Sequence, residues 1–104
     1  MPNSNRRAFD RDFAARLSQI GARVRELRLA HDLSQEKLSQ ASGVDYTYIC
    51  RIEGGRVNVS METLHRLASA LGVDVIEFLR VELSVRGKER RTPSAAQGPV
   101  RRRR

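Results

Sequence analysis

Apolar residues in the first third of the chain recur at steps of three and four positions. The series comprises Phe9, Phe13, Leu17, Ile20, Val24 and Leu27. This spacing places the six side chains on one face of an amphipathic helix, which we expect to run from Ala8 to about His31. Residues 1–7 are polar, and we expect them to form a flexible N-terminus. Gly21 interrupts the pattern and marks either a kink in this helix or a break between two helices.

A second pattern predicts four further helices, because each of their starts has an apolar residue, a capping residue and another apolar residue four positions after the cap. The four starts are Leu33-Ser34-Leu38, Val44-Asp45-Ile49, Val59-Ser60-Leu64 and Val73-Asp74-Phe78. Each is a hydrophobic staple around an N-cap, and Glu77 adds a capping box to the last. Gly43, Gly54-Gly55 and Gly72 supply helix stops. The chain is therefore predicted to be all-α, a compact five-helix bundle.

The stretch from Gln35 to Gly54 is the centre of this bundle. It is predicted to form two short helices joined by a tight turn at Gly43, where the backbone is expected to need a positive φ. The outer side of the second helix carries no aliphatic side chain; its residues are Tyr46, Thr47, Cys50, Arg51 and Gly54. A helix-turn-helix that exposes its second helix in this way fits the major groove of B-DNA.

Apolar and polar residues alternate strictly from Leu79 to Arg86. Period two is typical of a strand, whereas a fifth helix continuing to about Leu83 would carry apolar residues on both sides. Both interpretations leave more apolar surface than a small bundle buries, so we expect a homodimer interface at about residues 75–86. We assign residues 8–84 to the helix-turn-helix domain. Residues 85–104 lack periodicity and are expected to form a basic, disordered tail.

The formal net charge of +8 belongs almost entirely to this tail. Residues 1–84 contribute +1 and residues 85–104 contribute +7. The overall charge therefore says little about the folded part of the chain and indicates a tail that favours a polyanion. The arginines of the tail either lie along nucleic-acid phosphates or keep a disordered segment soluble.

The sequence also lacks the features of several functional classes. No run approaches the ~18 consecutive apolar residues of a membrane span, and the N-terminus has no apolar signal-peptide core. The single cysteine cannot form an intrachain disulfide. Neither a Cys/His cluster for zinc nor a nucleophile–base pair is present. We therefore expect a cytoplasmic, non-enzymatic protein with no metal, cofactor or small-molecule ligand.

Several segments together carry a family resemblance: IGARVRELRLA from Ile20, LSQEKL from Leu33, YICRIEGG from Tyr48 and LHRLASALGV from Leu64. Over about residues 15–80 the chain resembles the Xre-like helix-turn-helix regulators, which include phage repressors and Cro. The segments DYTYI from Asp45 and RVN from Arg56 are also similar to controller proteins of restriction–modification systems. The resemblance implies a repressor or autoregulator that binds a pseudo-palindromic operator on double-stranded DNA as a homodimer.

The resemblance also implies roles for single residues within the candidate DNA-binding set, which is Gln35, Asp45, Tyr46, Thr47, Cys50, Arg51 and Arg56. Gln35 would hold a phosphate at the positive end of its helix. Residues 46, 47 and 51 lie where family members read base edges, and the guanidinium of Arg51 suits bidentate bonds to guanine. Arg56 would contact the DNA backbone.

Two further interpretations concern residues around the second helix. Arg28 and Glu53 match a family ion pair that locks the first helix to the end of the recognition helix. Oxidation of Cys50, beside the contact face, would disturb DNA binding, but a small, partly buried residue where relatives often carry serine is the favoured interpretation.

An antitoxin-type module that neutralises a partner protein is the alternative function. Residues 79–86 and the tail would then be the functional part.

Overall fold

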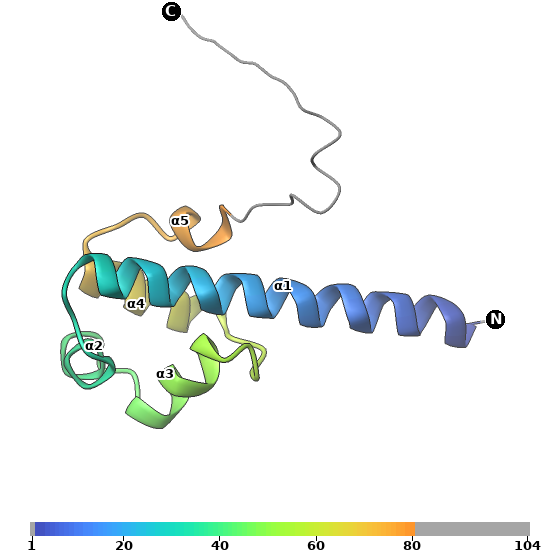
Figure 1. Cartoon of the computed structure of the whole chain (residues 1–104), viewed down its shortest axis with the longest axis horizontal. Helices are drawn as coiled ribbons and strands as arrows, with labels where there is room; N and C mark the ends of the chain where they lie inside the picture. The colour runs from blue at the N-terminus through green and yellow to red at the C-terminus, as the bar shows by residue number, and fades with distance from the viewer. Residues whose placement is uncertain (1, 81–104) are drawn as a thin grey trace, which may run out of the picture.

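The structure is a computed structural model that describes residues 2–80, and these residues form five helices and no strand. The helices are α1 (Pro2–Ala30), α2 (Gln35–Ser42), α3 (Tyr46–Glu53), α4 (Met61–Leu71) and α5 (Ile76–Leu79). Helix α1 forms the long axis, with α2 and α3 on one side of it and α5 on the other (Figure 1). The prediction of an all-α, five-helix fold is confirmed.

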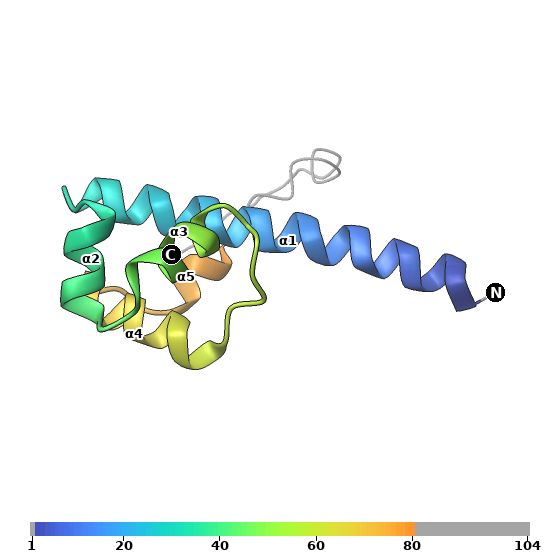
Figure 2. The ribbon, with the colours of Figure 1, turned by 90° about the horizontal axis from the view of Figure 1, so that it is seen from below.

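Helix α1 is longer than the sequence pattern predicts. It begins at Pro2 rather than Ala8, so residues 2–7 are helical where a flexible segment was expected. Proline suits the first turn of a helix because the N–H that it lacks would have no partner there. Residues 2–17, here called the projecting end of α1, extend beyond the bundle (Figures 1 and 2). Phe9 and Phe13 stack on each other there, and their exposed fractions are 63% and 36%.

Gly21 neither kinks nor breaks α1, which passes through this position as one helix. It is required for another reason, because a Cβ at Gly21 would collide with the carbonyl oxygen of Ile52 and lie 2.9 Å from that of Glu53. The end of α3 therefore packs directly on the backbone of α1. Gly55, at a φ of 72°, makes a similar approach one turn away, since a Cβ there would lie 2.7 Å from Ser18 Oγ.

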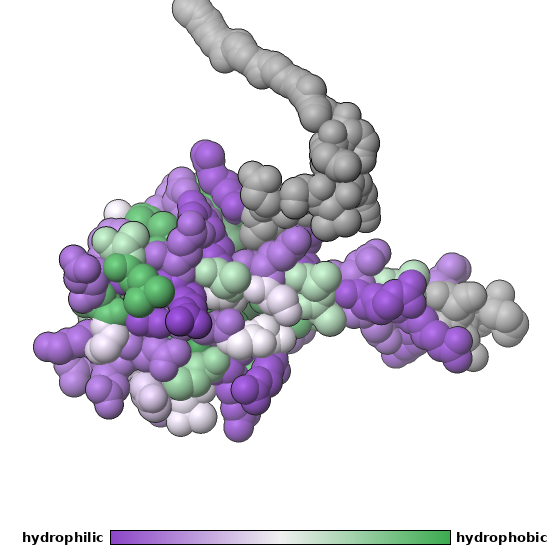
Figure 3. Space-filling model, in the orientation of Figure 1, coloured by the Kyte–Doolittle hydropathy of each residue, from purple (hydrophilic) through white to green (hydrophobic). Residues whose placement is uncertain are grey.

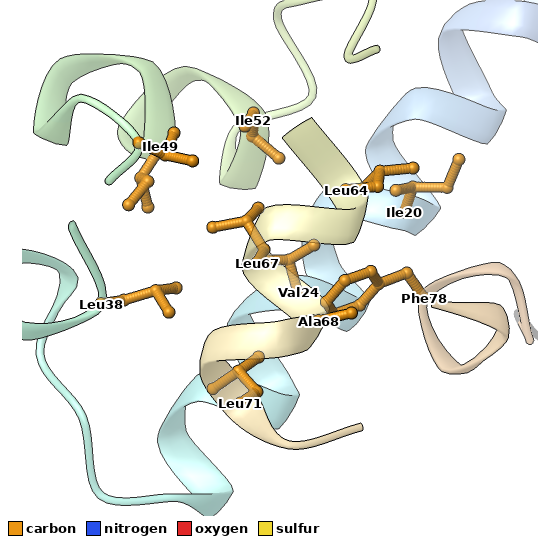
Figure 4. Close-up of a cluster of buried hydrophobic side chains, with 11 residues drawn as sticks. Ile20, Val24, Leu38, Ile49, Ile52, Leu64, Leu67, Ala68, Leu71 and Phe78 are labelled. Atoms are coloured by element: carbon orange, nitrogen blue, oxygen red, sulfur yellow. The ribbon is translucent and has the colours of Figure 1, made fainter. Parts of the chain in front are cut away.

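The hydrophobic core lies among the second half of α1 and the four shorter helices (Figure 4). Its buried members are Ile20, Val24, Leu38, Val44, Ile49, Ile52, Leu64, Leu67, Ala68, Leu71 and Phe78. Phe78 reaches from α5 toward Leu64 and Ala68 of α4 and is fully buried. This ring anchors α5, a helix too short to be stable without tertiary packing.

Three of the four predicted caps form as expected. The side chains of Ser34, Asp45 and Ser60 accept hydrogen bonds from backbone N–H groups in the first turns of α2, α3 and α4. Gly43 and Gly72 end α2 and α4 in the left-handed conformation, with φ of 76° and 69°. These local signals explain why the helix boundaries in the middle of the chain match the predicted ones.

The predicted capping box at the start of α5 is wrong. Asp74 Oδ1 accepts from the N–H of Ile76, but the Glu77 carboxylate turns to Arg23 on α1, with 3.1 Å between Arg23 Nη2 and Glu77 Oε1. A guanidinium is a stronger partner for a carboxylate than a backbone N–H. The expected strand or helix continuation after Leu79 lies outside the described residues from position 81 onward, as does the tail. None of the described helices is long and apolar enough to cross a membrane.

Candidate nucleic-acid interface

Helix α3 is fixed against the bundle by a buried ion pair. Arg28 Nε donates to Glu53 Oε2 at 2.7 Å, and Arg28 Nη2 donates to Glu53 Oε1 at 3.0 Å. Arg28 Nη1 also donates to the carbonyl oxygen of Leu33, just before α2. The ion pair that the family resemblance implied is thus present, and it joins α1, α2 and the end of α3. Its hydrogen bonds and the nearby carboxylate raise the pKa of Arg28, against the opposing effect of burial.

The two faces of α3 differ sharply. Ile49 and Ile52 point into the core, and Tyr48 packs against it. Thr47 and Arg51 are exposed on the opposite side, and Tyr46 is exposed at the first residue of the helix. No described residue forms a salt bridge with Arg51, so its guanidinium is available to an external acceptor. The structure therefore brings together the three residues at which base reading was expected, on one exposed stripe.

Two residues of the candidate set belong to the framework of α3. Asp45 caps the helix by accepting a hydrogen bond from the N–H of Thr47 at 3.0 Å. Cys50 is half-buried, and its thiol donates to Gln35 Oε1. Hydrogen bonding with its thiol, one turn away, raises the pKa of the Tyr46 hydroxyl. The phenol therefore stays protonated, and able to donate, to higher pH than an isolated tyrosine.

Gln35, the first residue of α2, is engaged inside the protein. Its Nε2 donates to Glu53 Oε1 at 3.0 Å, and its Oε1 accepts from Cys50 Sγ at 3.2 Å. A continuous chain of hydrogen bonds thus runs from Cys50 through Gln35 and Glu53 to Arg28. The side chain of Gln35, for which a phosphate contact is predicted, thus also ties the start of α2 to α3.

The loop after α3 places Arg56 at the edge of the same surface. Gly55 packs on Ser18 of α1, and the neighbouring Arg56 is exposed. In Figure 2, which views the molecule from the side of α2 and α3, this loop crosses close to α1. The exposed cations Arg51 and Arg56 therefore lie on consecutive segments of one face, as a ligand with negative charges along its length would require.

Comparison with known proteins identifies this arrangement. A family described as a helix-turn-helix domain matches residues 19–81. The chain belongs to this helix-turn-helix family. The control protein C.BamHI of Bacillus amyloliquefaciens is 38% identical over 66 residues, a match that covers 60% of this chain and 82% of that protein. The control protein C.SmaI of Serratia marcescens is 40% identical over 60 residues, covering 58% and 71%.

A solved structure gives the same result. The restriction-modification controller protein C.AhdI from Aeromonas hydrophila is 44% identical, with a TM-score of 0.60, and the match covers 62% of this chain and 97% of that chain. This helix-turn-helix chain is a DNA-binding transcriptional regulator, and the antitoxin alternative is not favoured by these relatives. The predicted resemblance to Xre-like regulators and restriction–modification controllers is confirmed.

Several contacts that position the interface join residues far apart in the chain, and the sequence pattern does not predict them. At Gly21 the sequence pattern predicts a kink or a break, whereas the structure shows the contact surface for the end of α3. Arg23 of α1 donates to the backbone carbonyl of Glu77 at 2.8 Å. A partner 54 residues away leaves no local signal. The buried position of Gly21 is visible only once α3 is packed.

Proposed function

We propose that this regulator reads a specific operator with Tyr46, Thr47 and Arg51 of α3 in the major groove and binds it as a homodimer. The observation that carries the proposal is the exposure of these three side chains on one stripe of a helix whose other side is buried. Recognition helices of this motif place exposed side chains against base edges in the same manner. Arg56 supports the proposal as an adjacent cation for the DNA backbone.

Arg51 is the residue on which base discrimination depends most in this proposal. A guanidinium that donates two hydrogen bonds to guanine O6 and N7 contributes about 1–3 kcal/mol of discrimination against other bases. Tyr46 and Thr47 lie one turn earlier on α3, where a hydroxyl and a methyl group suit a phosphate or the thymine methyl. Gln35 is a positioning residue, because its hydrogen bonds to Glu53 and Cys50 set how α2 meets α3.

The experiment begins with selection of an operator from random duplexes by the purified full-length protein. Arg51→Ala should then lose a factor of about 5 to 150 in the ratio of operator to scrambled-duplex affinity, corresponding to the loss of one bidentate pair. Arg66→Ala is the matched control, because Arg66 is an exposed arginine of α4 that pairs with Glu62. An Arg51→Ala variant with unchanged discrimination would refute the assignment of Arg51 as a base reader.

The homodimer is proposed to form through residues about 75–86. Within the described residues, α5 supports this by exposing two large apolar side chains, Ile76 at 48% and Leu79 at 41%. A two-fold dimer implies half-sites about 34–36 Å apart. The double substitution Ile76→Glu and Leu79→Glu should shift the molecular mass in sedimentation equilibrium from dimer to monomer. Met61→Glu, at an equally exposed position of α4, should leave the mass unchanged.

A further inference from the structure

The projecting end of α1 has a basic line on the side that meets the α3–α4 loop. Ser18 marks this side, because Gly55 packs on it. Arg11 lies seven residues and Arg7 eleven residues before Ser18, which is about two and three helical turns. Both arginines therefore lie within about 20° of a line drawn through Ser18 along the helix. Arg25, seven residues after Ser18, continues the line in the other direction.

The acidic residue of the projecting end nearest to this line is Asp10, three residues after Arg7, and no salt bridge joins the two. At about 100° per residue, Asp10 lies about 80° and Asp12 about 120° around the helix from the line. The apolar pair Phe9 and Phe13 lies on the far side, at about 180° and 140°. Among the side chains that the structure describes, none forms a salt bridge with the two arginines of the projecting end that lie on the line. Hydrophilic residues cover most of the visible face of the projecting end (Figure 3).

The line is continuous with the proposed DNA-binding surface. It starts at the Ser18–Gly55 contact, beside the exposed Arg56. With a rise of about 1.5 Å per residue, Arg11 and Arg7 lie about 10 Å and 16 Å farther along α1. Phosphates recur about every 3.4 Å along the axis of each DNA strand. A duplex that contacts Arg56 is therefore a dense polyanion, and the arginines of this face extend the cationic surface next to that contact.

We propose that the projecting end of α1 is a second DNA-contacting element, in which Arg7 and Arg11 bind backbone phosphates of the duplex whose major groove holds α3. This inference rests on the proposed function. The element lies outside the family match, which begins at residue 19. The structural match to C.AhdI covers 97% of that protein but only 62% of this chain. Phosphate contacts carry no sequence information, so the element adds affinity without changing operator preference.

The test compares two double variants that remove the same charge. The first variant, Arg7→Gln with Arg11→Gln, removes both positive charges that the projecting end contributes to the line. Arg6→Gln with Arg16→Gln is the control, because these arginines of the projecting end lie about 120° and 160° away from the line. The first variant should reduce the slope of log affinity against log salt by about 1.8 per protomer. Its affinity at low salt should fall about tenfold or more on operator and scrambled duplex alike. The control should keep the wild-type slope.

The outcomes separate this inference from the function on which it rests. Equal changes in slope for the two double variants would overturn it, because a general charge effect would then explain the loss. A change in sedimentation mass for the Arg7/Arg11 variant without a change in slope would also overturn it and would assign the face to a second copy of the chain. Failure of the wild type to prefer its operator would contradict the proposed function, whereas slopes on scrambled duplex would still test the two arginines. Circular dichroism checks that both variants keep the helical content of the wild type.

Discussion

Arg28 of α1 and Glu53 at the end of α3 form a two-point ion pair whose side chains are only 8% and 5% exposed. Gln35 donates a further hydrogen bond to the same carboxylate. One buried acidic group is therefore held by side chains from the end of α1 and the start of α2, and it fixes the last residue of α3. Together with the buried side chains of Ile49 and Ile52, this carboxylate sets the orientation of the exposed stripe on α3.

Glu53→Ala should destabilise the protein by about 3–5 kcal/mol, because it leaves the Arg28 guanidinium buried without its partner. Urea unfolding followed by circular dichroism measures the change. Glu62→Ala provides the comparison, since Glu62 pairs with Arg66 at the surface, where ion pairs contribute about 0–1 kcal/mol. Similar losses for the two variants would contradict a structural role for the buried pair.

Gly21→Ala should destabilise the protein by about 1–3 kcal/mol, although alanine normally favours a helix interior. The added methyl group meets the carbonyl oxygens of Ile52 and Glu53 and forces α3 away from α1. Gly54→Ala is the matched control, because Gly54 has a φ of −84° and its Cβ would have no neighbour closer than 3.4 Å. Thermal unfolding that ranked the two variants in the opposite order would rule out this close approach.

Phe78→Ala should lower the free energy of unfolding by about 3–5 kcal/mol, since it empties a fully buried site between α1 and α4. Met61→Ala, on α4, removes a side chain that is 54% exposed and lies outside the proposed dimer interface, so it should have an effect below about 1 kcal/mol. Denaturant titration of both variants measures the difference. Equal stability of the two would mean that α5 is not anchored by its aromatic ring.

The hydroxyl of Tyr46 should ionise at a higher pH than that of a free tyrosine, because the Cys50 thiol raises its pKa. Ultraviolet titration in a Tyr48→Phe background isolates this phenol, since the chain has only two tyrosines. Adding Cys50→Ala should move the transition to lower pH. The group is exposed, so the titration reports the local contact and not the stability of the fold. A transition that Cys50→Ala leaves in place would exclude the contact.

Short-range chemistry explains which features of the fold could be predicted. Ser34, Asp45 and Ser60 act on N–H groups two or three residues away, so their effect is present in the local sequence. The left-handed turn at Gly43 is local in the same sense. The start of α1 was placed too late because the polar residues 2–7 carry no apolar periodicity, although nothing in them prevents a helix.

The features that could not be predicted from the sequence depend on contacts between residues far apart in the chain. The bond from Arg23 to Glu77 replaces the expected capping box, and it joins residues 54 positions apart. The engagement of Gln35 by Cys50 and Glu53 likewise depends on how α2 meets α3. The exposure of Thr47 and Arg51 was predictable because helical spacing separates them from Ile49 and Ile52, whereas Tyr46 is exposed at the first residue of α3.

Because α1 is one uninterrupted helix, the number of residues between two positions sets the angle between their side chains around the helix axis. One residue inserted between Arg11 and Ser18 would rotate everything before it by about 100° and aim the arginines away from the loop. An insertion of seven residues, close to two full turns, would restore the phase and move the same arginines about 10 Å outward. The number of residues between these arginines and the bundle therefore sets the direction in which the arginines face.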